Sequence, residues 1–394
     1  MTGESGNGMF DEVYPCTGPY KVGVARTMES FMAMGGVWDR LAAEHGLHRP
    51  FLSHDWFRIW LGHFQGPSAL FIATVIKDEA PALIAPLLTR RERYKKIAPV
   101  VKIQFMGNHH SPVSSFIFGD SHPSERLESL RRLFCFLKES YRRWDVMELD
   151  AVPEEGDAAA TLERALEESG ISFVRQLAYN DWMLEDIGYS GEEYLNGRTK
   201  NLKKELRRRA RRLEEEGNVS FVTGNRLDEL EKYLGIYQEV RRKSWKHDEA
   251  DAAFLMDFRK WAMEKGWLRF AFLNVDDSPV SAHIRLVSNN KAYLMESVYD
   301  AAYREFSPTT LLRSLLMKYI IDNEDVRTID TIRGDEPYKA DWTPVKRRRI
   351  CFSTFNNSAR GQLFRFLLKV AAPAVRKIRT LSGRGRAGRQ GVEP

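Results

Sequence analysis

The sequence contains no apolar run that approaches the ~20 residues needed to cross a bilayer. Its first twenty residues contain Gly, Glu, Asp and Pro, and they lack the basic and apolar segments of a secretory signal. The three cysteines, Cys16, Cys135 and Cys351, are an odd number at wide spacing, which favours neither a disulfide framework nor a cysteine metal site. We therefore expect a protein of the cytoplasm.

Histidines are few and poorly placed for metal binding. His45 and His48, and the adjacent His109 and His110, lack the companion ligands that a zinc site needs. The sequence also has no Gly-x-Ser-x-Gly elbow and no Walker-type phosphate loop, which disfavours serine hydrolases and P-loop enzymes. No metal is expected to take part in the function.

Positive charge, by contrast, is concentrated in three segments. The 394 residues carry a net charge of +6, and 43% of them are hydrophobic, as in ordinary globular proteins. Residues 198–212 carry +8, residues 346–349 carry +4 and residues 360–394 carry +8, so the rest of the chain carries −14. This segregation favours binding of an anionic substrate, lipid or nucleic acid.

The clearest structural pattern lies in the C-terminal half. Residues 268–275 are apolar and β-prone, and the Asp-Asp-Ser-Pro that follows at 276–279 predicts a turn. Residues 280–286 alternate between apolar and polar, which predicts a strand with one apolar face. After a turn at 289–291, residues 292–299 predict a third strand. Three successive antiparallel strands are therefore expected.

A helix is predicted after these strands. Ser307 can cap it, Pro308 suits its first position, and apolar residues at helical spacing follow. Residues 328–332 predict a short strand, residues 334–337 open another helical turn, and residues 350–355 predict a final strand.

An internal repeat relates the two halves of the chain. At an offset of 198 residues, four positions of one predicted hairpin fall on four positions of the other: Leu70, Ala73, Asp78 and Pro81 on Leu268, Ala271, Asp276 and Pro279. In the first copy, a helix at 125–141 and a strand at 146–149 follow in the same order as in the second. We therefore predict an α/β (α+β) fold of two similar domains, with mixed, mostly antiparallel sheets flanked by helices.

The length of the chain suits two domains and a remainder. The expected parts are a flexible N-terminus at 1–20, an N-terminal domain at 21–185, a C-terminal domain with the working site at 186–358, and a basic amphipathic tail at 359–394. In the tail, Leu363, Leu367 and Val370 form one stripe flanked by Arg and Lys. This pattern predicts an interfacial helix for an anionic membrane, and the alternative is a helix that packs on its own domain.

Three groups of residues resemble the GNAT superfamily of acyltransferases: residues 298–300, Ser307-Pro308, and above all residues 333–342, Arg-Gly-Asp-Glu-Pro-Tyr-Lys-Ala-Asp-Trp. Within that superfamily the chain is most similar to the CelD-like acetyltransferases of exopolysaccharide synthesis, whose relatives include the Fem peptidyltransferases that use aminoacyl-tRNA. The basic segment 200–208 also resembles the start of the second GNAT domain in those proteins. The resemblance covers most of residues 190–345.

This resemblance implies acetyl-CoA or another acyl-CoA as the donor. Its pyrophosphate is expected at the N-terminus of the helix that Ser307 begins, where backbone N–H groups and the helix dipole favour an anion. The implied donor-binding residues are Ser307, Thr309, Thr310 and Leu311. The family usually has glycine where this chain has Thr309. Close approach of the pyrophosphate is then in question, and the hydroxyl of Thr309 or Thr310 is the expected replacement for the lost contact.

Lys339 and Asp335 are candidate catalytic residues. Lys339 lies in the first turns of a predicted helix, where a cation opposes the helix dipole at a cost of ~0.3–1 kcal/mol. The functional interpretation, which the resemblance to the Fem group supports, is that it faces a substrate phosphate or a developing oxyanion. The structural alternative is an i,i+4 pair with Asp335. Asp335 can cap the helix, orient Lys339 or accept a proton, and capping is favoured.

Two strands offer acid–base groups. His283 and Arg285 share the polar face of the strand 280–286, in the region where GNAT enzymes present side chains to the acceptor. A solvent-facing or hydrogen-bonded structural histidine is the alternative. Glu296 falls on the same strand face as apolar residues, so it lies at a bulge or is partly buried with a raised pKa. Glu296 is the preferred general base.

Further candidates concern the substrate. Tyr338 and Trp342 are four residues apart and are expected on one helix face, either in the core or as an aromatic wall for a sugar ring. The segment 198–212 predicts a helix with one narrow apolar stripe, which Gly217 can end. Its cations, Arg207 among them, are predicted to bind an anion, with a solvated face as the alternative.

These observations predict transfer of an acyl group, in particular acetyl, from acyl-CoA to an amine or hydroxyl of a sugar or polysaccharide precursor, either a small molecule or linked to a lipid. A Fem-like transfer from aminoacyl-tRNA is the close alternative. The alternative of another class is a non-catalytic module that binds nucleic acid or a membrane on a GNAT scaffold. The expected place is the cytoplasm, at the inner face of the membrane if the tail binds lipid.

Overall fold

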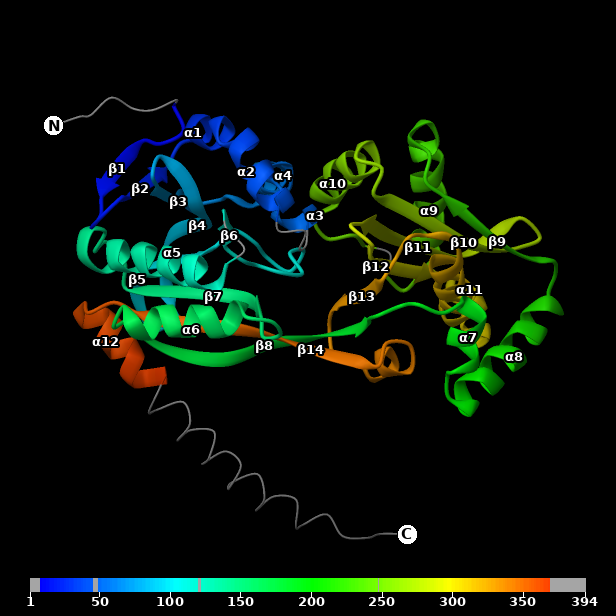
Figure 1. The fold of residues 1–394 in the computed structure, drawn as a ribbon. Coiled ribbons are helices and arrows are strands. Elements are labelled where there is room, and N and C mark those ends of the chain that lie inside the picture. Colours follow the sequence, from blue (N-terminus) through cyan, green and yellow to red (C-terminus); the bar gives the residue numbers. More distant parts are fainter. Residues whose placement is uncertain (1–7, 45–48, 120–121, 247, 369–394) are drawn as a thin grey trace, which may run out of the picture. The chain divides into compact units, whose positions relative to one another are not determined.

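The computed structural model describes residues 8–44, 49–119, 122–246 and 248–368 (Figure 1). His45, His48 and most of the predicted tail, residues 369–394, lie outside this description. The chain forms two compact units: unit 1 holds residues 1–45, 65–178 and 349–394, and unit 2 holds residues 46–64 and 179–348. Each unit combines a mostly antiparallel sheet with helices, which confirms the predicted fold class.

Unit 2 contains the three predicted antiparallel strands. Its strand order is β8-β13-β12-β11-β10-β9, and only the pair β12/β13 is parallel. The strands are β8 (Ser172–Leu184, from Tyr179 onward), β9 (Val219–Gly224), β10 (Leu268–Val275), β11 (Ser278–Ser288), β12 (Lys291–Tyr299) and β13 (Thr328–Arg333).

Helices cover both faces of this sheet. On one face of β10, Ala271 belongs to an apolar cluster with Leu312 and Leu316 of α11, and on the other Tyr233 of α9 packs on Phe270 with ring centroids 5.4 Å apart. The helices are α3 (Arg49–Leu52), α4 (His54–Phe64), α7 (Gly191–Asn196), α8 (Lys200–Glu214), α9 (Leu230–Lys243), α10 (Ala252–Glu264) and α11 (Pro308–Asn323), with 3-10 turns η2 (Leu227–Glu229), η3 (Ala301–Phe306) and η4 (Pro337–Asp341).

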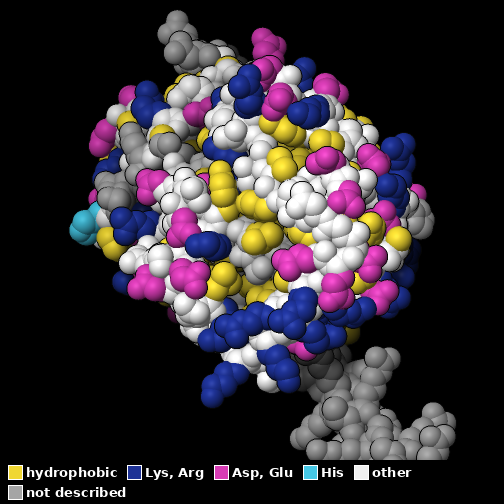
Figure 2. Space-filling view, turned by 90° about the vertical axis from the view of Figure 1, so that its right-hand side faces the viewer, with side chains coloured by type: hydrophobic (Ala, Val, Ile, Leu, Met, Phe, Trp, Pro, Cys, Tyr) yellow, Lys and Arg dark blue, Asp and Glu magenta, His cyan; other side chains and the backbone are white. Residues whose placement is uncertain are grey.

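The basic segment forms helix α8, as predicted. Thr199 caps it by accepting a hydrogen bond from Leu202 N–H at 3.2 Å, and the helix ends at Glu214, one turn before the expected Gly217. Leu213 is buried, whereas the Lys and Arg side chains are exposed or half-buried. Figure 2 views the side on which α8 and β9 lie in Figure 1, and on it Lys and Arg gather in a band beside hydrophobic side chains.

Unit 1 has the strand order β1-β2-β3-β4-β5-β7-β14, and β6 pairs with β4. Its strands are β1 (Glu12–Pro15), β2 (Tyr20–Ala25), β3 (Ala69–Lys77), β4 (Ala80–Tyr94), β5 (Ala98–Phe105), β6 (Ile117–Phe118), β7 (Val146–Pro153) and β14 (Val345–Phe355). Its helices are α1 (Met28–Ala33), α2 (Gly35–Glu44), α5 (Pro123–Cys135), the π-helical η1 (Phe136–Ser140), α6 (Ala158–Glu168) and α12 (Ala359–Phe366). Leu133, Phe134, Leu162 and Leu166 of its helices join the main apolar core.

The hairpins β3/β4 and β10/β11 correspond residue by residue. Each has a two-residue turn with positive φ at both positions, 48° and 62° at Asp78-Glu79 and 46° and 63° at Asp276-Asp277. Each ladder also shifts register just before the turn, and the pairs Ile76↔Pro81 and Asn274↔Pro279 differ by the predicted 198 residues. The equivalence of the two hairpins is confirmed.

The compact units differ from the predicted domains at 21–185 and 186–358 in three segments, residues 46–64, 179–185 and 349–358. Residues 46–64 belong to unit 2, where Trp56 of α4 packs edge-on against Phe254 and Phe258 of α10. Residues from 349 onward belong to unit 1, because β14 pairs with β7. These contacts join residues far apart in sequence, so local patterns do not reveal them.

The described start of the tail packs on unit 1. In α12, Phe364 is buried and its ring meets Tyr94 edge-on at 5.0 Å, and Leu367 packs beside it. Leu363 and Phe366 are exposed. The part described thus follows the alternative in which the helix packs on its own domain, while Val370 lies outside the described residues. No helix in the described part of the chain is long and apolar enough to span a bilayer.

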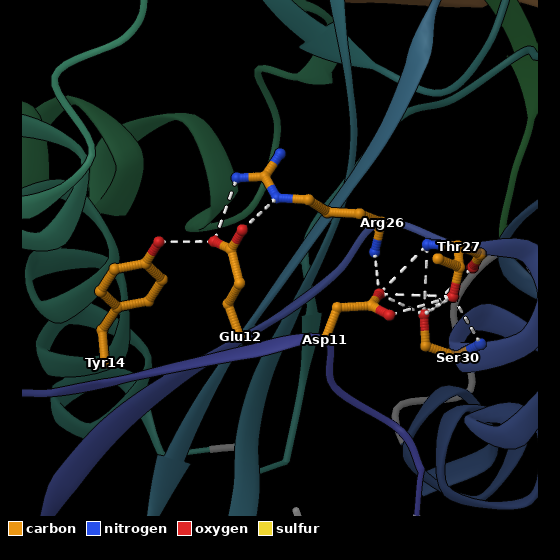
Figure 3. Close-up of polar contacts among 6 residues, drawn as sticks. All are labelled: Asp11, Glu12, Tyr14, Arg26, Thr27 and Ser30. Atoms are coloured by element: carbon orange, nitrogen blue, oxygen red, sulfur yellow. Dashed lines mark hydrogen bonds and ion pairs between the residues drawn. The ribbon is translucent and has the colours of Figure 1, made fainter. Parts of the chain in front are cut away.

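A polar cluster secures the N-terminal strand of unit 1 to α1 (Figure 3). Asp11 accepts hydrogen bonds from Arg26 N–H at 2.6 Å, Ser30 Oγ at 2.6 Å and Thr27 N–H at 3.1 Å. Burial raises the pKa of Asp11, but these hydrogen bonds outweigh it and leave the pKa lowered. The carboxylate therefore stabilises unit 1 in its ionised form.

Replacing Asp11 with alanine is expected to destabilise unit 1 by about 1–2 kcal/mol at pH 7, because Arg26 N–H, Thr27 N–H and the Ser30 hydroxyl lose their shared acceptor. Since the folded pKa is lowered, this contribution is present above the unfolded value of about 3.9 and is lost as the pH falls through the folded pKa. Thermal melts at pH 7 and pH 3 should show a deficit that narrows at pH 3. Glu29→Ala, in the same first turn, is the control, and an equal deficit at both pH values would contradict the prediction.

Candidate functional site

A cavity of about 800 Å³ lies within unit 2. Its walls come from α8, the segment after α9, the end of β12, the start of α11 and η4. The lining residues are Thr199, Asn201, Leu202, Glu205, Arg209, Ser244, Trp245, Lys246, Ser297, Tyr299, Thr309, Thr310, Arg313, Tyr338, Asp341 and Trp342. The predicted residues Thr309, Thr310, Tyr338 and Trp342 therefore share one cavity.

The N-terminus of α11 offers this cavity fewer backbone donors than expected. Ser307 occupies the N-cap position as predicted, but it lies in the left-handed region, with φ 50°, and its side chain makes no capping hydrogen bond to the described helix. Pro308 has no N–H, and Thr310 N–H already bonds to Ser307 O at 2.9 Å. Thr309 N–H alone in this first turn has no partner among the described residues.

Two arginines supply further donors to the cavity. Arg313 lies on α11 one turn after Thr309, its guanidinium is 4.8 Å from the centre of the Tyr338 ring, and its buried Nη1 has no acceptor in the described structure. Arg209 Nε lies 3.3 Å from Glu205 Oε2 but forms no hydrogen bond with it. Because a buried donor without an acceptor costs about 1–3 kcal/mol, the cavity is suited to an anionic ligand.

The strand at the back of the cavity is open along one edge. β12 pairs with β13 only over Lys291–Tyr293, and beyond this point the two strands have no described pairing. On its other edge the register with β11 shifts between the pairs Ile284↔Glu296 and Arg285↔Leu294, which places a bulge in β12. Ser297 and Tyr299 follow the bulge and line the cavity. Beyond Tyr293, this edge of β12 therefore has no described strand partner beside the cavity.

The bulge explains the position of Glu296. Leu294 joins the apolar cluster beneath α11, whereas Glu296 turns to the opposite face and pairs with Arg241 of α9 and with Arg259 Nη2 at 3.5 Å. The predicted bulge is confirmed, but a face shared with Leu294 is wrong. Glu296 therefore sits behind the cavity wall, in an ion-pair cluster that also includes Glu249.

His283 and Arg285 do not face solvent, because α11 covers their side of the sheet. Their exposed fractions are 2% and 0%. Arg285 pairs with Glu324 at 2.7 Å. Burial, followed by the charges of Arg285 and Arg313, lowers the pKa of His283 well below its usual value, and its Nδ1 has no described partner. The two residues share a strand face as predicted, but that face is buried rather than exposed. In the β11/β12 ladder His283 pairs with Ser297.

Lys339 and Asp335 lie apart. Lys339 is buried, and its Nζ donates to Arg333 O at 3.0 Å and Ile332 O at 3.3 Å and pairs with Glu336 at 3.0 Å. The alternative pair with Asp335 is therefore wrong. Asp335 does not cap η4: it accepts from Asn180, Trp182 and Lys346 at 2.9, 3.1 and 2.7 Å, and the Lys346 contact leads in lowering its pKa. Neither side chain lines the cavity.

The two aromatic residues line the cavity from different directions. The turn η4 is a 3-10 helix, so residues four apart do not share a face as they would in an α-helix. Trp342 is 3% exposed and belongs to the core beneath α11, whereas Tyr338 is 48% exposed. Trp245, which is 66% exposed, joins them as a third aromatic ring on the cavity.

Most cavity residues were missed as individual candidates, among them Arg209, Arg313, Asp341 and Trp245. Arg313 lies on the α11 helix, one turn beyond the donor-binding threonines, which is a usable signal. Asp341 is part of the motif at 333–342 but was not singled out, and in the described structure it makes no salt bridge. Trp245 follows α9 in a segment with no repeating pattern. By contrast, the predicted Leu311 and Arg207 line a second, separate groove.

One family model and several solved structures are similar to this chain. Residues 200–340 match the model of the family described as "Acetyltransferase (GNAT) domain". FemX has 12% identity and a TM-score of 0.53, and the match covers 84% of this chain and 98% of that one. A conserved protein of unknown function from Bacteroides thetaiotaomicron has 10% identity and a TM-score of 0.52, with 84% and 99% covered. At such identities the likeness shows the fold alone. No curated protein matches the chain.

Proposed function

We propose that the cavity of unit 2 catalyses transfer of an acyl group from acyl-CoA, in particular acetyl-CoA, to an amine or hydroxyl of a sugar. The match of residues 200–340 to an acetyltransferase (GNAT) domain supports acyl transfer in general. The observation that carries the proposal is the set of unpartnered donors, Thr309 N–H and Arg313 Nη1, at the start of α11. They fit the phosphate groups of the donor.

The donor in this proposal extends from α11 toward the open edge of β12. Its pyrophosphate meets Thr309, the Thr310 hydroxyl, Arg313 and Arg209, so side-chain cations replace backbone N–H groups that Ser307 and Pro308 cannot supply. The thioester carbonyl then reaches the unpaired part of β12, where a backbone N–H can stabilise the oxyanion that forms on attack.

The acceptor in this proposal lies between Asp341 and the exposed rings of Trp245 and Tyr338. Asp341 accepts the proton as the amine or hydroxyl attacks the carbonyl carbon, and collapse of the tetrahedral intermediate expels the thiolate of CoA. Aromatic faces suit the apolar faces of a sugar ring. Lys339 acts in this scheme by holding the η4 turn that carries Tyr338 and Asp341. Glu296 and His283 support the β12 wall from behind and beside it.

The direct test follows release of CoA thiol from acetyl-CoA with amino sugars and neutral sugars as acceptors. Turnover above the rate of acetyl-CoA hydrolysis supports the proposal. If aminoacyl-tRNA rather than acyl-CoA supports transfer, the donor assignment is overturned in favour of a Fem-like reaction. Salt-dependent RNA or lipid binding without any acyl transfer would identify a non-catalytic module.

A substitution at Thr309 tests the donor site separately. Thr309→Glu is expected to weaken CoA binding by more than tenfold, because a carboxylate at the first turn repels the pyrophosphate from its only free backbone donor. Thr309→Gln has a similar size without the charge and serves as the control. Calorimetric titration with CoA measures both variants, and equal affinities would show that the pyrophosphate lies elsewhere.

A further inference from the structure

Helix α8 separates two hollows of unit 2. One flank of the helix, with Glu205 and Arg209, lines the cavity described above. The other flank, with Lys203, Leu206 and Arg207, lines a groove of about 480 Å³. This volume is within the range of about 300–1,000 Å³ found for ligand sites. The groove has no role in the proposed acyl transfer.

The floor of the groove is apolar. It is formed by residues of α7, α8, β9, β10 and α11: Leu195, Leu206, Ala210, Leu213, Val219, Phe221, Leu273, Leu311 and Leu315. Leu315 is 38% exposed although it belongs to the otherwise well-packed α11. Exposed apolar surface gathered in a hollow is typical of binding sites, since water solvates it poorly. The floor therefore fits a hydrocarbon group.

The charged side chains that line the groove are Lys203, Arg207, Glu192 and Glu214, and a stripe of further cations runs along α8 past it. Lys200, Lys204, Arg207 and Arg211 recur at helical spacing and so form one stripe along α8. None of them makes a salt bridge with a described carboxylate, whereas Arg208 pairs with Glu205 on the same helix. Arg207 belongs to both the stripe and the groove, so its charge stands where the groove opens. Figure 2 shows such a band of Lys and Arg beside hydrophobic side chains.

We infer that α8 and this groove form a docking site for an anionic lipid membrane. The stripe contacts lipid phosphates, Arg207 holds one head group, and an acyl chain of that lipid enters the apolar groove. RNA would satisfy the cations equally well, but its bases stack on aromatic rings, and the groove is lined by aliphatic side chains with Phe221 as the one ring. The inference is independent of the proposed acyl transfer.

Sedimentation of the full chain with vesicles tests the stripe. The protein should bind vesicles of phosphatidylglycerol and phosphatidylcholine, and should not bind phosphatidylcholine alone. The triple variant Lys204→Gln, Arg207→Gln, Arg211→Gln should bind about a hundredfold more weakly, since each cation near an anionic surface contributes about fivefold. The control triple, Lys232→Gln, Arg242→Gln, Lys260→Gln, removes three exposed cations from α9 and α10. Both triples retain residues 369–394, so a difference between them belongs to α8.

A second variant tests the groove. Leu315→Asp should weaken vesicle binding by about tenfold, because a carboxylate in the groove opposes entry of the chain, and Leu227→Asp on η2 is the control at another exposed leucine. Circular dichroism verifies that each variant is folded. Equal vesicle binding by the two triples overturns the proposal, as does binding that Leu315→Asp and Leu227→Asp weaken alike. Loss of binding to an RNA hairpin by the α8 triple, with vesicle binding unchanged, assigns the stripe to RNA and also overturns it.

Discussion

The double variant Arg209→Gln, Arg313→Gln is expected to bind CoA about a hundredfold more weakly than the natural chain. Each hydrogen bond from a charged donor is worth about 1.5–3 kcal/mol, and about 1.4 kcal/mol corresponds to a tenfold change in affinity. Both side chains line the same cavity, so the two losses are not strictly additive. Of the two single variants, Arg313→Gln should weaken CoA binding more than Arg209→Gln. The reason is that the nearby carboxylate of Glu205 partly neutralises the charge of Arg209.

Calorimetric titration with CoA measures this loss. Pantetheine, which has no phosphate group, provides a neutral ligand whose weak binding should not change. The control double variant is Arg208→Gln, Arg212→Gln, which removes two cations from α8 that do not line the cavity. If both double variants lose affinity alike, the effect is one of overall charge and the assignment of Arg209 and Arg313 fails.

Lys339→Ala is expected to reduce acyl transfer mainly by destabilising unit 2, by about 2–4 kcal/mol. The substitution leaves the carbonyl groups of Ile332 and Arg333 without their buried donor. Ile332 already has φ 50°, a costly conformation for a β-branched residue, and the lysine holds this corner in place. For a unit of this size the midpoint of thermal unfolding should fall by roughly 5–10 °C.

Thermal melts and turnover must be measured together for this variant. Lys346→Ala, which removes an exposed lysine paired with Asp335, is the control and should change stability little. Lys339→Ala that melts normally and yet loses turnover more than tenfold would restore the hypothesis that Lys339 faces the substrate. Normal melting and normal turnover would remove it from both roles.

Periodicity was sufficient to predict β10, β11 and β12 of unit 2 and the helix α11, whereas β8 and β9 were not predicted. Alternation between apolar and polar residues identified β11, and the acidic turn at Asp276-Asp277 is the kind of sequence that tolerates positive φ at two positions. The same reasoning at an offset of 198 residues identified the hairpin of unit 1. These features depend on neighbours in sequence, which a single chain displays directly.

The positions of His283 and Arg285 show why the site was harder to predict. The alternating pattern shows that the two residues share a face of β11. It does not show that this face is also buried, because the helix that covers it, α11, begins more than twenty residues later in the chain. Likewise, the bulge in β12 was anticipated, yet the partners of Glu296 come from α9 and α10. Contacts between distant elements decide burial and ion pairing, and local sequence patterns do not show which elements come into contact.

The return of β14 to unit 1 affects the order in which the chain can fold during synthesis. Ile350 pairs with Val152, so closing this ladder joins residues about two hundred positions apart. Contacts of such long sequence separation form slowly, because the intervening chain must be ordered first. The edge of β7 remains without its β14 partner until nearly the whole chain has left the ribosome. Unit 2, whose main segment ends at residue 348, completes its sheet earlier, so the N-terminal unit is the later of the two to finish.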